Sequence, residues 1–267
     1  MFTHKARKRF GQNFLNNEQI IHQIIQVMSV TKNQSVVEIG PGKGAITKYL
    51  IKQAKHLTAI ELDRDLIPIL IRQFSEYHNK LDIISHDALQ FDFSTLYADD
   101  ITTPTYRLVG NLPYNISTPL LIHLIQFRQC IKDMHFMLQN EVVDRLVAKP
   151  NTKNYGRLSI LMQYFYQIDK KFIVPPNAFT PMPKVDSAIV SLTPYNNTDK
   201  AHGLAVKNIE MFKKISKLSF QQRRKTIRNN LKGIISQEQF DLIGIKGSER
   251  AENLSILQFI QLSNLCS

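Results

Sequence analysis

The stretch SVVEIGPGKGA, at residues 35–45, decides the fold of this 267-residue chain. Its first five residues predict a buried β-strand, its glycines a tight turn, and residues 45–55 continue with a helical pattern of apolar side chains. Strand, glycine turn and helix in this order are typical of nucleotide-binding α/β folds, because glycine lets the backbone pass close to a ligand and a helix N-terminus offers unpaired N–H groups. The loop is not a Walker phosphate loop, since Gly44 follows Lys43 where that motif needs Ser or Thr.

Further predicted strands follow the glycine loop, and each delivers a polar side chain at its carboxyl end. They are expected at 57–60, at 81–85 and from Tyr106 onward. Open α/β sheets bind ligands along the edge that the carboxyl ends of their strands form. We therefore expect one site that is lined by Gly40, Glu61, Asp87 and Asn111.

The glycine loop and Glu61 leave the class of cofactor open. Glu61 lies 21 residues beyond Gly40, about the spacing at which an acidic side chain binds ribose hydroxyls in such folds. Gly40, Gly42 and Ala45 also fit the glycine fingerprint of nicotinamide-binding proteins. A nicotinamide oxidoreductase is therefore one candidate, although it gives no reason for the next segment or for the charge at the two ends of the chain.

The segment YRLVGNLPYNISTP, at residues 106–119, carries most information about chemistry. We expect Gly110 to let a ligand approach the backbone, and the proline after Leu112 to hold that residue out of the helical region, so that its carbonyl can accept a hydrogen bond. The Asn111 side-chain oxygen is a second acceptor, and Tyr114 offers an aromatic face. Two acceptors and a ring suit the exocyclic amine of a purine or pyrimidine. The alternative is an ordinary prolyl turn.

The remaining sequence predicts further strands of the same sheet, followed by a helical domain. Helices are expected at 17–28, 140–148 and 157–164, and strands at 134–138, 172–174 and 187–192, which brings the sheet to about seven strands. A polar linker follows Tyr195, and no strand pattern is seen beyond it. We expect an α/β domain at 1–196, with a basic lid segment at 1–16, and an all-helical domain at 197–267.

Charge is strong and unevenly distributed. The chain has 34 Lys and Arg against 22 Asp and Glu, a net charge of +12. Lys5, Arg7, Lys8 and Arg9 precede any acidic residue, and residues 200–267 hold twelve basic and five acidic residues. Two basic ends around a balanced middle suggest that a nucleic acid lies across the protein. Solubility alone is the plainer alternative.

Composition argues against several classes of protein. The 43% hydrophobic content is that of an ordinary globular core. No run is long and apolar enough to span a membrane, and the N-terminus lacks a hydrophobic signal segment, so we expect a cytoplasmic protein. We also expect a monomer. Two cysteines, without HExxH or paired Cys/His spacing, predict neither a disulfide framework nor a metal site.

Several separated motifs resemble those of bacterial small-subunit (16S) rRNA adenine dimethyltransferases of the KsgA type, over residues 7–262. They are RFGQNFL at 9–15, EIGPG at 38–42, IELD at 60–63, DA at 87–88, GNLPYNIS at 110–117, FTP with PKVDS at 179–187, and QRRKTIRN at 222–229. The resemblance implies a Rossmann-like class I methyltransferase fold, with seven strands of which the last is antiparallel, a small helical domain, and S-adenosylmethionine as cofactor.

The resemblance also implies roles for individual residues. The cofactor site would contain Asn13, Leu15, Gly40, Gly42, Glu61, Asp87 and Asn111. A flipped-out adenine would be held and oriented by Asn111, Leu112, Pro113, Tyr114 and Phe179. RNA phosphates would meet Arg7, Lys8, Arg9, Arg223, Arg224, Lys225 and Arg228. For Phe179 alone, packing in the core is the plainer interpretation, and Lys43 is given no role.

The family reaction transfers two methyl groups to N6 of each of two adjacent adenosines near the 3′ end of small-subunit rRNA, during ribosome assembly. A large-subunit rRNA methylase that confers macrolide resistance would share the catalytic motifs. An RNA-binding assembly factor with little catalysis is a candidate from another class. The segment at 222–229 favours the small-subunit enzyme, through the resemblance.

Overall fold

The computed structural model describes residue 7, residues 11–96 and residues 105–266, and the chain divides into two compact units. The first consists of Met1–Val143 and Asp169–Pro194, and the second of Asp144–Ile168 and Tyr195–Ser267. The expected domain boundary at residue 196 stays a prediction, because the second unit starts near it but also includes a segment from the middle of the chain.

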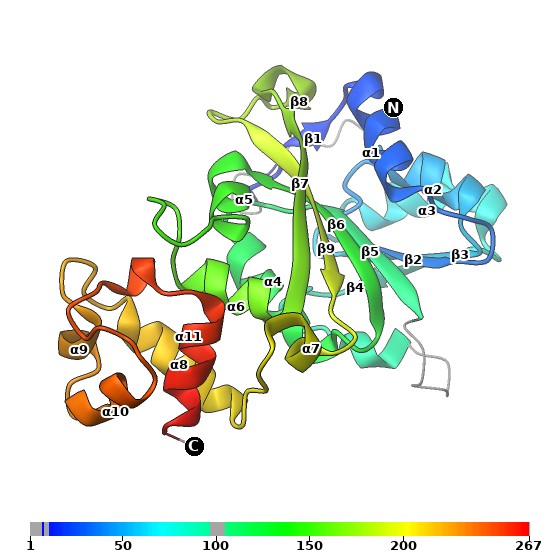
Figure 1. Ribbon diagram of the computed structural model, residues 1–267. Helices are drawn as coiled ribbons and strands as arrows, with labels where there is room; N and C mark the ends of the chain where they lie inside the picture. Colours follow the sequence, from blue (N-terminus) through cyan, green and yellow to red (C-terminus); the bar gives the residue numbers. More distant parts are fainter. Residues whose placement is uncertain (1–6, 8–10, 97–104, 267) are drawn as a thin grey trace. The chain divides into compact units, whose positions relative to one another are not determined.

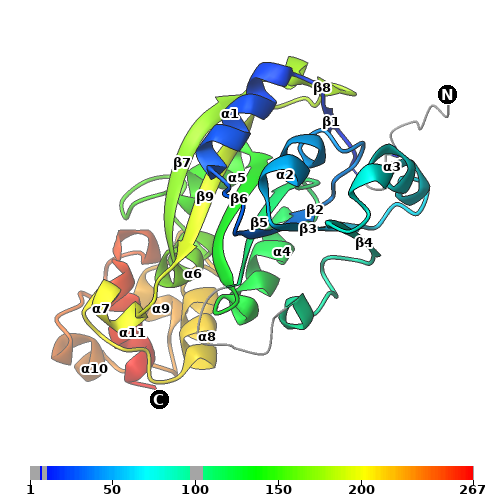
Figure 2. The same cartoon turned by 90° about the vertical axis from the view of Figure 1, so that its right-hand side faces the viewer.

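The first unit is built on a seven-stranded sheet (Figures 1 and 2). In spatial order its strands are β4 (Leu81–Ser85), β3 (His56–Glu61), β2 (Ser35–Ile39), β5 (Tyr106–Asn111), β6 (Ile131–Gln139), β9 (Ser187–Pro194) and β7 (Tyr166–Val174). The strands from β4 to β6 pair in parallel, whereas β9 runs antiparallel to β6. Seven strands and an antiparallel last strand were predicted, and both features are confirmed.

Helices cover both faces of this sheet (Figures 1 and 2). On one face lie α1 (Glu18–Met28), α2 (Thr47–Gln53) and α3 (Ile67–Gln73), and on the other lies α4 (Ser117–Leu124). The change of face follows from right-handed crossovers, because the strand order runs outward from β2 to β4 and then returns to β5 on the other side of β2. Ligands bind at such a reversal, outside the carboxyl ends of the strands.

Two strands that the sequence did not predict form a separate antiparallel pair. They are β1 (Phe14–Leu15) and β8 (Phe179–Thr180), with Leu15 opposite Phe179. Each is two residues long, too short for an alternating pattern to be recognised. Just after β1, the Asn17 side chain accepts from the N–H of Ile20 at 3.1 Å and caps α1.

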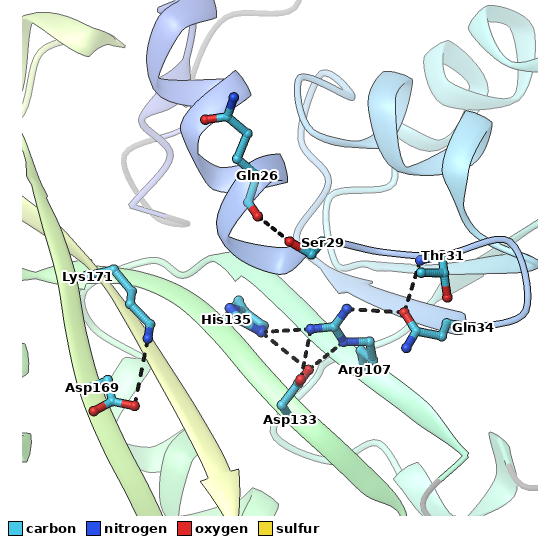
Figure 3. Close-up of polar contacts among 9 residues, drawn as sticks. All are labelled: Gln26, Ser29, Thr31, Gln34, Arg107, Asp133, His135, Asp169 and Lys171. Carbon is cyan, nitrogen blue, oxygen red and sulfur yellow. Dashed lines mark hydrogen bonds and ion pairs between the residues drawn. The ribbon is translucent and has the colours of Figure 1, made fainter.

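The edge strand β7 is longer than the predicted strand at 172–174. The prediction was too short because polar residues in the first half of β7 hide the strand pattern. Asp169 and Lys171 form an ion pair of 3.7 Å on it, and Figure 3 shows this contact. Strands at a sheet edge are often charged, which protects them from pairing with another chain.

Figure 3 also shows a buried polar cluster at the amino ends of β5 and β6. The Arg107 guanidinium donates to both carboxylate oxygens of Asp133 at 2.8 Å and to Gln34 at 3.2 Å, with His135 beside it. Burial by itself would raise the pKa of Asp133, but hydrogen bonds from His135 and Arg107 outweigh burial and lower it to about 2. The cluster lies at the sheet edge opposite the carboxyl ends of these strands, and we assign it to the scaffold.

The second unit is helical. Its helices are α6 (Arg157–Phe165), α7 (Thr198–His202), α8 (Ile209–Ser219), α9 (Ile227–Asn230), α10 (Gln237–Leu242) and α11 (Ile256–Asn264). Phe212, Phe240 and Phe259 are fully buried in it. The helix α5 (Asn140–Leu146) spans the boundary of the units, and short 3-10 helices are η2 (Ser75–Tyr77), η3 (Phe93–Leu96), η4 (Ile125–Phe127), η5 (Pro176–Ala178) and η6 (Ala251–Asn253).

Candidate cofactor and substrate site

A cavity of about 310 Å³ lies in the first unit at the carboxyl ends of β2, β3, β4 and β5. Residues 11–15, 38–43, 45–46, 60–62, 86–88 and 111–116 line it. Its volume is within the range of cavities that hold small ligands. The residues that were expected at the carboxyl ends of four strands all line this cavity: Gly40, Glu61, Asp87 and Asn111.

Glycine is required in the loop between β2 and α2. Gly40 and Gly42 have φ angles of +67° and +60°, which other residues rarely adopt. A Cβ atom on Gly42 would also lie 3.1 Å from the Phe14 ring, so that the ring or the loop would have to shift by a few tenths of an ångström. The loop therefore brings its backbone to the wall of the cavity.

The expected reason for Gly110 was wrong. A Cβ atom there would lie 2.7 Å from the Ile39 carbonyl oxygen and 2.9 Å from the Leu112 side chain. Gly110 is not among the residues that line the cavity. Its small size lets β5 pack closely against β2, where Gly110 pairs with Ile39, and it does not serve the approach of a ligand.

Glu61 presents a fixed and largely desolvated carboxylate to the cavity. Only 6% of the residue is exposed, and its oxygens accept from the N–H groups of Gly42 at 3.1 Å and Asp63 at 2.8 Å. Burial raises the pKa of Glu61, and the two N–H groups offset this only in part. A carboxylate has about four acceptor positions, so this arrangement fits a ribose, whose two neighbouring hydroxyls are donors.

Glu38 also lines the cavity, and the sequence analysis did not single it out. It is 2% exposed and accepts a hydrogen bond from the Thr47 hydroxyl at 2.6 Å. Burial raises its pKa to about 7. An acidic residue inside an otherwise apolar strand, directly before the glycine loop, was the signal that could have identified it.

Asn111 and Tyr114 are held by specific contacts. The Asn111 side-chain nitrogen donates to the Asn13 carbonyl at 2.8 Å, and this contact leaves its oxygen to act as an acceptor. The Tyr114 hydroxyl lies 3.0 Å from the Ser187 hydroxyl, which anchors the edge of the ring. Leu112 and Pro113, between these residues, also line the cavity, so the whole of the expected substrate motif faces it.

Other residues of the expected cofactor site lie near the same cavity. Asn13 and Leu15 line it, and Leu15 also packs in the core. Asp87 accepts from the N–H of Leu89 at 2.9 Å, which orients its carboxylate. Phe179 differs: it is 4% exposed, packs in the same core as Leu15, and is not among the residues that line the cavity. Its stacking role stays a prediction.

The expected RNA-binding residues fall into two groups, and their role stays a prediction. Lys8 and Arg9 lie outside the described residues, and Arg7 forms ion pairs with Asp63 and Asp65. The other four are exposed in the second unit: Arg223, Arg224, Lys225 and Arg228.

The described part of the chain has neither a membrane-spanning helix nor a cluster of metal ligands. None of its helices is both long and apolar enough to cross a bilayer. Residues 7, 11–96 and 105–266 also contain no group of three or more His, Cys, Asp or Glu side chains placed to hold a metal ion.

Comparisons with known sequences identify the family of this chain. A family model described as Ribosomal RNA adenine dimethylase matches residues 3–267. Ribosomal RNA small subunit methyltransferase A of Saccharophagus degradans is 50% identical over 266 residues, which are 99% of this chain and 96% of that protein. The protein of the same name from Marinomonas sp. is 48% identical over 263 residues, 98% of this chain and 95% of that protein.

Solved structures share the fold. A dimethyladenosine transferase from Plasmodium falciparum matches with a TM-score of 0.78 at 26% identity, over 93% of this chain and 95% of that chain. The 23S rRNA methyltransferase ErmE matches with a TM-score of 0.69 at 22% identity, over 95% of this chain and 99% of that chain. These matches confirm the predicted class I methyltransferase fold. Because the family model matches nearly the whole sequence, the chain belongs to the ribosomal RNA adenine dimethylase family.

Proposed function

We propose that this protein transfers methyl groups from S-adenosylmethionine to N6 of two adjacent adenosines in the 3′-terminal hairpin of 16S rRNA. The step would belong to the assembly of the small ribosomal subunit in the cytoplasm. The observation that carries the proposal is the contact of Asn111 with Asn13, because it directs the amide oxygen of Asn111 as an acceptor at the wall of the cavity. Relatives that are about half identical and are named as small-subunit methyltransferases support the choice of substrate.

The cofactor would be held by residues at the ends of three strands. Glu61 would accept the ribose hydroxyls, Asp87 would accept from the adenine amine, and the Gly40 backbone would pass beside the amino-acid end. S-adenosylmethionine supplies a methyl group on a sulfonium, which is already a strong methyl donor. The protein therefore has to bind and orient the reactants, without a covalent intermediate on the enzyme.

The target adenine would be oriented by the motif that follows β5. The Asn111 side-chain oxygen and the Leu112 carbonyl would accept the two amine hydrogens, so that the nitrogen lone pair is directed at the methyl group. The Tyr114 ring would stack on the base. A second stacking face from Phe179 would require its ring to turn out of the core, where it is 4% exposed.

The direct test is transfer of labelled methyl groups to ribosomal subunits. Purified protein and labelled S-adenosylmethionine would be incubated with small subunits from a strain that lacks the modification, and the label mapped by primer extension and mass spectrometry. We expect N6,N6-dimethyladenosine at two adjacent positions near the 3′ end of 16S rRNA. Label in 23S rRNA instead would identify the large-subunit activity.

The alternative hypothesis, an RNA-binding assembly factor with little catalysis, is tested by a separate experiment. An Asn111→Ala variant that is folded but does not transfer methyl groups would be expressed in a deletion strain. If methylation is the main function, this variant should fail to restore the small-subunit maturation defect. Full restoration would show that binding of the immature subunit, and not methylation, is what the cell requires.

A further inference from the structure

Asp63 is a buried carboxylate that does not line the cavity, and the proposed chemistry gives it no role. It is 1% exposed, although it directly follows the loop residue Leu62. Its oxygens accept from the Gln12 side chain at 2.8 Å, from Arg7 at 3.2 Å and from the N–H of Asp65 at 3.2 Å. A buried carboxylate needs such donors, because charge without hydrogen bonds is costly to desolvate.

Gln12 connects this carboxylate to the N-terminal segment. Its side-chain nitrogen donates to Asp63, and its side-chain oxygen accepts from the Arg7 N–H at 2.8 Å. Both contacts need this orientation of the amide, because the carboxylate is only an acceptor and the N–H only a donor. Gln12 itself lines the cavity, together with its neighbours from Gly11 to Leu15.

The next residue, Asn13, is bound on the other side. Its carbonyl accepts from the Asn111 side chain at 2.8 Å. Consecutive residues of one segment are thus tied to the loops that follow two different strands, Gln12 to the loop after β3 and Asn13 to the end of β5. A displacement of Gln12 would move the carbonyl that orients Asn111.

We propose that Asp63 is a positioning residue which, through Gln12, holds residues 11–15 along the cavity and so keeps the Asn111 amide oriented and the cofactor enclosed. The inference rests on the proposed function in giving Asn111 the amine-orienting role. We call the contacts of Arg7, Gln12 and Asp63 the latch. Arg7 belongs to it because its guanidinium is paired with Asp63 and Asp65.

The test uses the full-length protein and variants of Gln12, which is only partly buried and can be changed without leaving a hole in the core. The readouts are the dissociation rate of S-adenosylhomocysteine, the rate of trypsin cleavage after Arg7, and methyl transfer at saturating cofactor. For Gln12→Ala we expect the first two rates to rise roughly tenfold or more, as for a lost hydrogen bond to a charged group, and methyl transfer to fall. Asp65→Asn is the matched comparison, because it weakens only the Arg7 part of the contact and keeps the Gln12–Asp63 bond. Its effect on each rate should be the smaller one, within about threefold of the wild type, as expected for an exposed ion pair.

A charged variant adds a pH signature that a general loss of stability would not produce. In Gln12→Glu, two carboxylates would face each other, and only a protonated Glu could donate to Asp63. The repulsion raises the pKa of the new side chain, so the dissociation rate of the variant should approach that of the wild type as pH falls from 8 toward 5.5. A constant ratio of the two rates over this range would contradict the proposal.

The outcomes separate this inference from the proposed function. S-adenosylhomocysteine release and trypsin cleavage can be measured without RNA. If the wild-type protein methylates no rRNA, the proposed function is overturned, but these two rates still test the contact between Gln12 and Asp63. If Gln12→Ala and Asp63→Ala keep both rates within twofold of the wild type, the latch is overturned. The same holds if Gln12→Ala lowers the melting temperature but changes neither rate, because Asp63 would then only stabilise the fold.

Discussion

The side-chain nitrogen of Asn111 donates a hydrogen bond to the main-chain carbonyl of Asn13, with 2.8 Å between the two atoms. A carbonyl oxygen can only accept, so the contact decides which end of the amide faces the other way. It joins residues 98 positions apart in the sequence and brings the segment before α1 to the end of β5. An acceptor that is oriented before the substrate binds costs no reorganisation during the reaction.

The first prediction concerns this amide. Asn111→Ala should lower methyl transfer by about 10²- to 10³-fold, the loss typical for one preorganised contact in an active site. Asn111→Asp should be at least as damaging, because a carboxylate oxygen would face the Asn13 carbonyl and no donor would remain. Rates must be measured at saturating S-adenosylmethionine, since Asn111 also lines the cofactor cavity. RNA binding should persist, because phosphate contacts dominate it. A loss below tenfold would remove Asn111 from the chemistry.

The second prediction separates the ring of Tyr114 from its hydroxyl. Tyr114→Phe loses only the contact with Ser187, worth about 0.5 to 1.5 kcal/mol, whereas Tyr114→Ala also loses the stacking face. Methyl transfer should therefore fall much more in the Ala variant. Ser187→Ala is the matched control, because it breaks the same hydrogen bond from the other side, and it should resemble Tyr114→Phe. Equal damage from Phe and Ala would mean that the phenol acts as an acid, base or donor, and stacking would be the wrong mechanism.

The third prediction concerns Glu61 and the cofactor. Glu61→Ala removes the acceptor for the ribose hydroxyls, and each hydrogen bond to a charged group is worth roughly 1.5 to 3 kcal/mol. Glu61→Gln should also bind S-adenosylmethionine more weakly, because its NH₂ group would face one of the two N–H donors that the carboxylate now accepts. Calorimetry measures both affinities, and circular dichroism checks the fold. Unchanged affinity, or tighter binding of NAD, would contradict the assignment.

The sheet and the position of the cavity could be predicted because they depend on local patterns. The strand before Gly40, the spacing to Glu61 and the motif after Tyr106 each identify the carboxyl end of one strand, and parallel topology brings these ends together. Glycines with positive φ were also recognisable, since few other residues tolerate that conformation.

The remaining features depend on contacts between distant segments, which a single sequence does not reveal. The β1–β8 pair joins residues about 165 positions apart, and Asp63 gains its partners only when the N-terminal segment lies against the loop after β3. Gly110 was misread for the same reason, because the atom that excludes a side chain there belongs to Ile39 in the neighbouring strand. For Phe179, core packing was already the plainer interpretation of the sequence, but its pairing opposite Leu15 in β1 could not be foreseen.

The fourth prediction concerns the basic segment of the second unit. Replacing any one of Arg224, Lys225 and Arg228 by Gln should weaken RNA binding and flatten its dependence on salt by about 0.7 to 0.9 of a slope unit, one phosphate contact each. The effect of Arg223 should be smaller, because its guanidinium donates to the Lys153 carbonyl at 3.0 Å and lies 3.9 Å from the Glu252 carboxylate. Arg228 makes only a longer bond of 3.3 Å, to the neutral Gln237 side chain. Binding titrations at salt concentrations from about 50 to about 300 mM measure the slope of log affinity against log salt concentration.

The control for the RNA surface is Lys32→Gln, which removes an exposed charge that precedes β2 at its amino end, opposite the cavity. It should leave the slope unchanged, and none of these variants should alter the affinity for S-adenosylmethionine. An unaltered slope in a variant that lacks all four cations would move the RNA surface elsewhere, most directly to the basic run at residues 5–9.

The last prediction concerns the buried Glu38 and the dependence of stability on pH. Burial raises its pKa from 4.5 to about 7 in the folded protein, so between these values the unfolded chain has lost a proton that the native protein keeps. Stability should therefore fall as pH rises from about 4.5 to about 7, by roughly 3 kcal/mol at full effect. Glu38→Gln removes this titration while it can still accept from Thr47, so it should match the wild type near pH 4 and be more stable by about 2 to 3 kcal/mol at pH 8. Urea unfolding across this range measures the difference, and parallel stability curves for the two proteins would show that folding does not raise the pKa of Glu38. Glu38 lines the cofactor cavity, so we expect the more stable Glu38→Gln variant to bind S-adenosylmethionine less well. Residues that serve an active site often lower the stability of the fold.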